Sequence, residues 1–172
     1  MALRHRGVIV AERKVAGGHN AASDPVTRWV TFRLGDEIYG INVMQVQEVL
    51  RLPEIAPVPG APYYVVGIIN LRGNVVTVID TRKSFGLPPV EPTDQTRIVI
   101  IEAGTHIVGI LADSVAEVVD LRTSEIETAP NIGNEDSNKY VQGVHSRNDR
   151  ILILVDTSKL LRQEEWDQIA TF

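Results

Sequence analysis

Paired carboxylates are the residues of this sequence whose spacing could support acid–base chemistry. Asp80 and Asp156 each follow a short apolar run, and each is followed by a threonine. Two carboxylates can act as acid and base when their surroundings separate their pKa values. Equivalent surroundings favour a structural role, in which each carboxylate caps the turn that follows it. A catalytic pair remains the alternative.

The four histidines and the glycines show none of the spacings typical of metal or nucleotide sites. His5 and His19 lie near the N-terminus, and no two histidines have the i, i+4 spacing of a helical zinc site. The chain has no cysteine, which excludes disulfides, thiolate nucleophiles and cysteine-based zinc sites. No G-x-G or phosphate-loop pattern occurs. We therefore expect a non-catalytic protein without a metal or cofactor.

Charge and hydropathy narrow the classes of partner and compartment. The 172 residues carry a formal net charge of -5, whereas nucleic-acid binding requires a basic face that displaces counterions. No apolar run approaches the roughly 20 residues of a membrane helix, and the one near Val8 is too short for a secretion signal. These features predict a cytoplasmic protein that binds no nucleic acid and does not insert into a membrane.

Short apolar runs separated by turn residues predict an all-β fold with short helices. Val30, Phe32 and Leu34 alternate with polar residues, as in a half-buried strand. Glycines and asparagines between such runs predict hairpins. Residues 1–25 show neither the helical nor the strand period of apolar residues, and we expect them to form a flexible tail. We expect residues 26–165 to form the folded domain and residues 166–172 to form the C-terminal end.

An internal repeat is the strongest pattern in the chain. Residues 29–52 align with 98–121 at a constant offset of 69, without a gap and with nine identities, and residues 65–83 align with 141–159 at an offset of 76. Fixed-offset similarity indicates repeated architecture, and sheets of this size commonly close into barrels. We predict two five-stranded barrel subdomains, approximately 28–90 and 96–162, that share a core. Exchange of segments between them is left open.

Two charged residues stand beside apolar runs. Glu48 lies within residues 46–52, and Arg72 follows Asn70-Leu71. They either point to solvent from alternating strands, or they frame an apolar groove and form an ion pair or a partner contact. A helix of a partner could insert its apolar side chains into such a groove. Four valines would supply its surface: Val43, Val46, Val49 and the repeat-related Val118.

Several segments together resemble the CheW-like coupling proteins of bacterial chemotaxis. The first is the L-G-D-E-I-Y-G-I hairpin within residues 32–42, and the second is N-L-R-G within residues 67–73. Residues 46–49, 78–80, 108–110 and 151–161 add to the resemblance in the same order and spacing. The resemblance covers about residues 27–162.

This resemblance implies a pair of SH3-like five-stranded β-barrels that catalyse no reaction. It implies an adaptor linking the helical-hairpin tips of methyl-accepting chemoreceptors to the histidine kinase CheA, whose regulatory domain has the same fold. The docking positions implied for receptor and kinase are Val43, Val46, Glu48, Val49, Arg72 and Val118. A CheW-like adaptor of a non-flagellar pathway, such as one controlling pili, is the alternative. An enzyme or a nucleic-acid-binding barrel is the third hypothesis.

Overall fold

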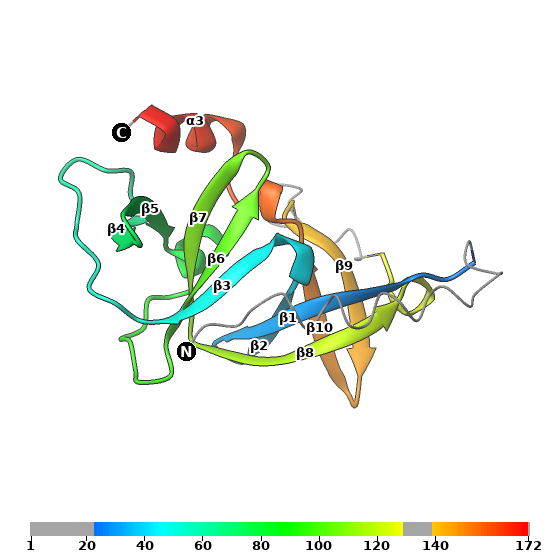
Figure 1. Ribbon diagram of the computed structural model, residues 1–172. Coiled ribbons are helices and arrows are strands. Elements are labelled where there is room, and N and C mark those ends of the chain that lie inside the picture. The colour runs from blue at the N-terminus through cyan, green and yellow to red at the C-terminus, as the bar shows by residue number, and fades with distance from the viewer. Residues whose placement is uncertain (1–22, 129–138, 172) are drawn as a thin grey trace.

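The computed structural model describes residues 23–128 and 139–171, which form two five-stranded sheets (Figure 1). The expected tail therefore lies almost entirely outside the described residues. The strands are β1 (Val26–Leu34), β2 (Glu37–Asn42), β3 (Val46–Arg51), β4 (Val65–Leu71), β5 (Asn74–Ile79), β6 (Arg97–Ala103), β7 (His106–Ala112), β8 (Ser114–Arg122), β9 (Val141–Arg147) and β10 (Arg150–Val155). The helical elements are η2 (Val43–Gln45), α2 (Thr81–Ser84), η3 (Thr123–Glu125), η5 (Thr157–Lys159) and α3 (Gln163–Thr171). The predicted all-β class is confirmed.

The two sheets exchange strands between the two sequence repeats. The first sheet has the order β8-β1-β2-β10-β9, and the second has the order β3-β6-β7-β5-β4. Each sheet thus contains the hairpin of one repeat and three strands of the other. Residues far apart in the chain must pair before either sheet is complete, so the two units are interlocked rather than consecutive.

Two parallel strand pairs join the repeats at equivalent places. In the first sheet β10 runs parallel to β2, from Leu152 opposite Ile38 to Val155 opposite Ile41. In the second sheet β5 runs parallel to β7, with Ile79 opposite Ile110. All other strand pairs are antiparallel. The sequence repeat is therefore also a structural repeat.

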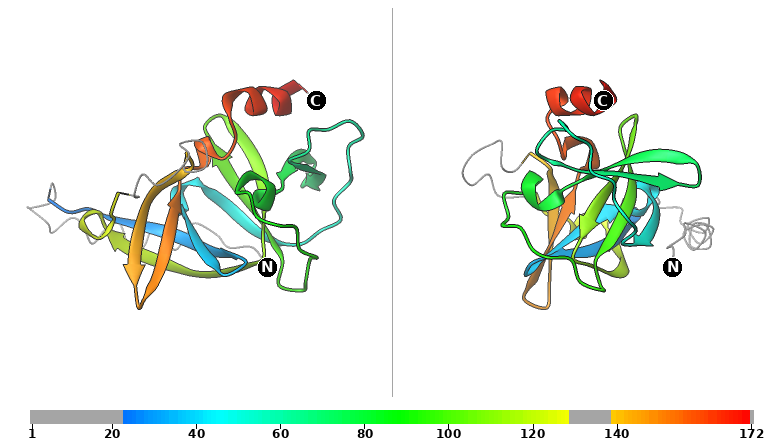
Figure 2. Two further views of the ribbon diagram at one scale, coloured as in Figure 1. Left: turned by 180° about the vertical axis from the view of Figure 1, so that it is seen from behind. Right: turned by 90° about the vertical axis from the view of Figure 1, so that its left-hand side faces the viewer.

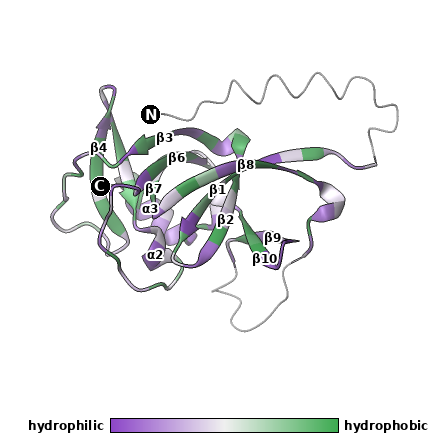
Figure 3. Cartoon of the chain, turned by 90° about the horizontal axis from the view of Figure 1, so that it is seen from below, coloured by the Kyte–Doolittle hydropathy of each residue, from purple (hydrophilic) through white to green (hydrophobic). Residues whose placement is uncertain are grey.

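A shared apolar core lies between the sheets. Val30 and Ile41 of the first sheet belong to the same buried cluster as Val99 and Ile110 of the second. Figure 3 shows the hydrophobic residues distributed along the strands of both sheets. The prediction of a common core is confirmed, because neither sheet covers this face alone.

The connection between β3 and β4 extends beyond the second sheet, on the side away from the first sheet (Figure 2). It is held at one point, where Ala56 and Ile68 form an isolated antiparallel bridge with two backbone hydrogen bonds of 2.9 Å. Glu127 and Val144 form the corresponding bridge in the other repeat, with bonds of 2.8 and 2.9 Å. Each bridge brings the chain leaving one edge strand onto the opposite edge strand and so helps to close the sheet into a barrel.

Helix α3 covers one end of the second sheet (Figure 1). Trp166 is buried, donates from Nε1 to the Ser158 carbonyl at 3.0 Å, and stacks on His106 with ring centroids 5.0 Å apart. The C-terminal helix is thus anchored by its tryptophan. Across residues 23–128 and 139–171, every helix is too short or too polar to span a membrane.

Candidate functional site

Glu48 and Arg72 form a bidentate ion pair across the second sheet. Nη1 of Arg72 donates to Oε1 of Glu48 at 3.2 Å, and Nη2 donates to Oε2. β3 and β4 are the two edge strands of this sheet, so the ion pair joins its edges at the tip of the β4–β5 hairpin. The interpretation that these two residues pair is confirmed.

The two partners differ strongly in exposure. The Glu48 side chain is 9% exposed and the Arg72 side chain is 68% exposed. The hydrogen bond and the charge of Glu48 raise the pKa of Arg72 above its ordinary value. The pair therefore presents a fixed cation at the surface while the carboxylate beneath it stays compensated.

The hairpin turn positions the Arg72 backbone. Arg72 and Gly73 both have positive φ, 52° and 88°, which is the pattern of a two-residue type I′ turn. The Asn70 side chain accepts a hydrogen bond from the Gly73 amide at 2.8 Å. This turn closes the hairpin with Leu71 opposite Asn74, and it places Arg72 at the tip.

The structure contradicts the expectation that Val43, Val46 and Val49 provide accessible apolar surface. They are 5%, 0% and 5% exposed and belong to the cluster shared by both sheets. The physical reason is the strand exchange, because η2 and β3 carry the chain from the first sheet to the second and their three valines pack into the core that both sheets share. An intact fold leaves no trough at these three valines into which a partner helix could insert.

A bulge in β3 separates Glu48 from these valines. Val46 is opposite Ile101, but Glu48 is opposite Ile100, so Gln47 is the extra residue. The bulge shifts the alternation of faces, and Val49 rejoins Val46 in the shared core while Glu48 faces Arg72. Strict period-2 reasoning from the sequence would have placed Val46 and Glu48 on one face.

Val118 is the one predicted valine with substantial exposure, at 42%. It lies on β8, an edge strand of the first sheet, directly opposite the buried Val30 of β1. Residues directly opposite each other share a sheet face, so Val118 lies at the margin of the shared core.

Met44 is an exposed apolar residue that sequence reasoning missed. Its side chain is in η2, between two buried valines, and the residue is 64% exposed. The Asn42 side chain accepts a hydrogen bond from the Met44 amide at 2.9 Å and caps this short helix. Asparagine is a frequent cap residue, so Asn42 was the available signal that a turn begins here and directs a side chain outward.

Asp80 and Asp156 cap the turns that follow them, as predicted. Asp80 accepts from the Lys83 amide at 3.3 Å at the start of α2. Asp156 accepts from the Ser158 amide at 3.1 Å and from its hydroxyl at 2.7 Å at the start of η5. Each carboxylate thus has the structural role that its repeat-equivalent position indicated.

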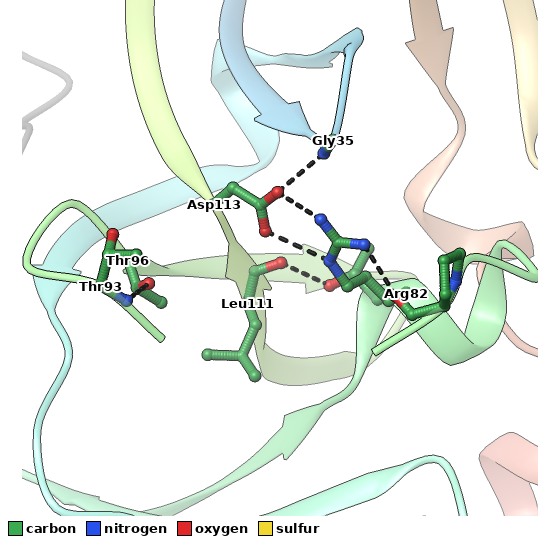
Figure 4. Close-up of polar contacts among 8 residues, drawn as sticks. Gly35, Arg82, Thr93, Thr96, Leu111 and Asp113 are labelled. Atoms are coloured by element: carbon green, nitrogen blue, oxygen red, sulfur yellow. Dashed lines mark hydrogen bonds and ion pairs between the residues drawn. The ribbon is translucent and has the colours of Figure 1, made fainter. Parts of the chain in front are cut away.

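A second ion pair, which the sequence did not reveal, ties the two sheets together (Figure 4). Arg82 of α2 contacts Asp113 through Nε at 3.3 Å and Nη2 at 2.5 Å, and Nη1 donates to the Pro88 carbonyl at 2.7 Å. Asp113, between β7 and β8, also accepts from the Gly35 amide in the β1–β2 turn at 2.7 Å. One guanidinium therefore connects α2 and the segment after it to the point where the chain passes back to the first sheet.

No cluster of three or more histidine, cysteine, aspartate or glutamate side chains suited to a metal ion occurs in residues 23–128 and 139–171. The geometry of the described residues thus defines a class of protein: an all-β molecule of two interlocked barrel-like sheets with ion pairs at its sheet edges and junctions. The strands of these two sheets set which side chains are presented at the surface.

Comparison with known proteins identifies the family within that class. Residues 28–165 match the model of the CheW-like domain. That match spans most of the chain, which therefore belongs to the CheW-like family. The fold implied by the sequence resemblance is confirmed.

Individual relatives support this assignment over most of their length. The chain is 34% identical to the chemotaxis protein CheW of Klebsiella aerogenes, covering 80% of this chain and 82% of the relative. It is 35% identical to the chemotaxis protein CheW of Bacillus subtilis, with coverages of 80% and 88%. The crystal structure of the scaffolding protein TtCheW from Thermoanaerobacter tengcongensis superposes with a TM-score of 0.75 at 30% identity, covering 82% of this chain and 96% of that one.

Proposed function

We propose that this protein is a non-catalytic adaptor of bacterial chemotaxis that couples methyl-accepting chemoreceptors to the histidine kinase CheA by docking both. The observation that carries the proposal is the match of residues 28–165 to the CheW-like domain, together with relatives named as chemotaxis and scaffolding proteins. The interlocked sheets supply a rigid body, and a rigid body suits a scaffold because docking then orders few side chains.

We place the docking surface only at residues whose side chains are accessible in the structure. Arg72 offers a fixed cation whose counter-charge is buried beneath it, and Val118 offers apolar area at the margin of the shared core. We add Met44, which is exposed beside the buried valines. Charged groups next to apolar anchors set register and specificity, which suits recognition of a receptor helix.

Val43, Val46 and Val49 contribute indirectly in this proposal. Their packing in the shared core fixes the path of η2 and β3, which carry Met44 and Glu48. Glu48 in turn holds Arg72 in place. Truncation of these valines should weaken docking only to the extent that it destabilises the fold.

The test is binding of the full chain to a receptor cytoplasmic-tip fragment and, separately, to CheA. Val118→Lys should reduce receptor binding at least about 10-fold, since it places a charge in the apolar contact. Val90→Lys is the matched control, because Val90 is also an exposed valine, at 56%, on the loop before β6. Equal binding by both variants would refute the placement of the surface.

The choice of partners also separates the main proposal from its alternative. An adaptor of a non-flagellar pathway would have the same fold and would bind receptors and a kinase of that other pathway. Failure to bind the flagellar-pathway receptors and CheA, with retention of the pili-pathway partners, would replace the main proposal with this alternative.

A further inference from the structure

A pocket of about 270 Å³ lies where residues of both repeats meet. Its walls come from the segments just before β4 and β9, from α2 and η5, and from the start of α3. Two pairs of lining residues are related by the repeat offset of 76: Tyr64 with Tyr140, and Lys83 with Lys159. The pocket is therefore approximately symmetric, with one lysine and one tyrosine from each repeat.

Lysines are concentrated at this pocket. The chain has four lysines in all, and Lys83, Lys139 and Lys159 line it. Arg162 adds a fourth cation and Glu165 is the one carboxylate of the lining. A chain with a formal net charge of -5 thus gathers most of its lysines around one cavity.

Two of the four lining cations, Lys83 and Lys139, have no ion-pair partner within residues 23–128 and 139–171, and the other two are each paired with one carboxylate. Lys83 donates to the carbonyl oxygen of Tyr63 at 3.0 Å, which is a neutral acceptor. Lys159 makes an ion pair at 4.0 Å with Asp156, three residues before it in the chain. Glu165 pairs with Arg162 at 3.5 Å.

The tyrosine walls are held in place by their own contacts. The Tyr64 hydroxyl lies 2.7 Å from Oε1 of Gln168 and 2.9 Å from the Glu165 carbonyl, and Tyr64 is buried. Tyr140 stacks on Phe85 with ring centroids 4.0 Å apart. A pocket whose walls are fixed before binding is typical of a small-molecule site.

We propose that this pocket binds a small phosphate-bearing anion, with Lys83 and Lys159 each contacting one phosphoryl group. Cations gathered at one cavity repel each other, and a bound polyanion relieves that repulsion. Lysine ammonium groups bind phosphate oxygens as compact point charges with freely rotating donors. The small volume and the clustering of charge at one point favour a compact anion over an extended acidic peptide, which would need a row of cations.

Isothermal titration calorimetry of the full chain with sodium pyrophosphate, at constant ionic strength, tests the proposal. We expect saturable binding that the double variant K83Q/K159Q weakens at least about 10-fold, because it removes both charge-assisted contacts. The control R147Q/R150Q removes the same net charge from two exposed arginines of the β9–β10 hairpin and should leave the affinity unchanged. Thermal unfolding followed by circular dichroism verifies that both variants fold.

Three outcomes would overturn the proposal. One is the absence of measurable pyrophosphate binding at concentrations up to about 10 mM. Another is equal weakening by the two double variants, which would indicate general charge screening. The third is tighter binding of hexaglutamate than of pyrophosphate at the same lysines, which would assign the pocket to an acidic peptide. Receptor binding by K83Q/K159Q should be unchanged, so failure here is distinguishable from failure of the adaptor proposal.

Discussion

Replacing Gly67 by alanine should destabilise the fold strongly, because the new methyl group has no room. A Cβ at this position would lie 2.3 Å from the Ala56 carbonyl oxygen, 2.9 Å from its carbonyl carbon and 2.8 Å from Cγ2 of Ile55. Two of these three atoms are backbone, which a side-chain rotation cannot move away. The segment at Ala56 must therefore shift outward.

The cost follows from the contacts that such a shift breaks. Ala56 and Ile68 exchange two backbone hydrogen bonds of 2.9 Å, each worth about 1 kcal/mol net. Residual crowding adds about 1–2 kcal/mol, within the range for overpacking. We expect Gly67→Ala to lower the free energy of unfolding by about 3–4 kcal/mol.

Gly143 is the repeat-equivalent comparison. An added Cβ there would lie 2.7 Å from Cγ2 of Ile126 and 3.1 Å from the Glu127 carbonyl oxygen. The closest atom is now a side-chain methyl, which can move, so we expect a smaller loss of about 1–2 kcal/mol. The two substitutions are chemically identical, and the difference between them isolates the backbone clash.

Urea-induced unfolding, followed by tryptophan fluorescence, measures both losses, and hydrogen exchange reports the Ala56 and Ile68 amides directly. Gly67→Ala should lower the protection of these two amides selectively. If Gly67→Ala lowered the free energy of unfolding by less than about 0.5 kcal/mol and left the protection of both amides unchanged, the predicted clash with the Ala56 backbone would be refuted. A larger loss for Gly143→Ala than for Gly67→Ala would refute it as well.

Three further predictions concern the contacts that hold the two sheets and α3. Arg82→Ala should lower the free energy of unfolding by about 1–3 kcal/mol, measured by urea unfolding, because Asp113 loses its partner in a half-buried site. Trp166→Ala should lower it by about 3–5 kcal/mol and expose the amides of α3 to hydrogen exchange. Burial raises the pKa of Tyr64 from 10.0 to about 12. The folded state therefore holds this proton more tightly, so stability should fall as pH rises from about 10 to 12. Tyr64→Phe should reduce that dependence, as checked by urea unfolding at each pH.

The strands and the repeat were predictable because their signals are local or periodic. Val30, Phe32 and Leu34 alternate in the sequence with Thr31 and Arg33, and the structure places all three apolar residues in the core. Matched Asp80 and Asp156 indicated a shared structural role, which both have as caps. Such features depend on residues near each other in the chain, so the sequence alone carries them.

The exchange of strands between repeats was not predictable from the alignment. An offset of 69 or 76 shows that two segments are alike, but it does not show which copy of a strand pairs with which hairpin. The same uncertainty explains the error at Val43, Val46 and Val49. An apolar strand face has the same sequence pattern whether it is covered by another sheet of the same chain or by a partner protein.

Of two ion pairs that join distant parts of the chain, one was predicted from the sequence and the other was not. Glu48 and Arg72 were found because Glu48 lies within an apolar run and Arg72 ends a strand, where a charge needs an explanation. Arg82 and Asp113 are 31 residues apart, and nothing in their local sequence indicates that they meet. Only the fold, which places α2 beside the β7–β8 junction, brings them together.

The most direct test of the adaptor account is kinase activity in a reconstituted mixture of receptor fragment, CheA and this chain. We expect CheA autophosphorylation in the presence of receptor to rise at least about 10-fold when the full chain is added, and Val118→Lys to abolish most of this increase. An autophosphorylation rate that is the same with and without the chain, at concentrations where the chain is folded, would contradict the account.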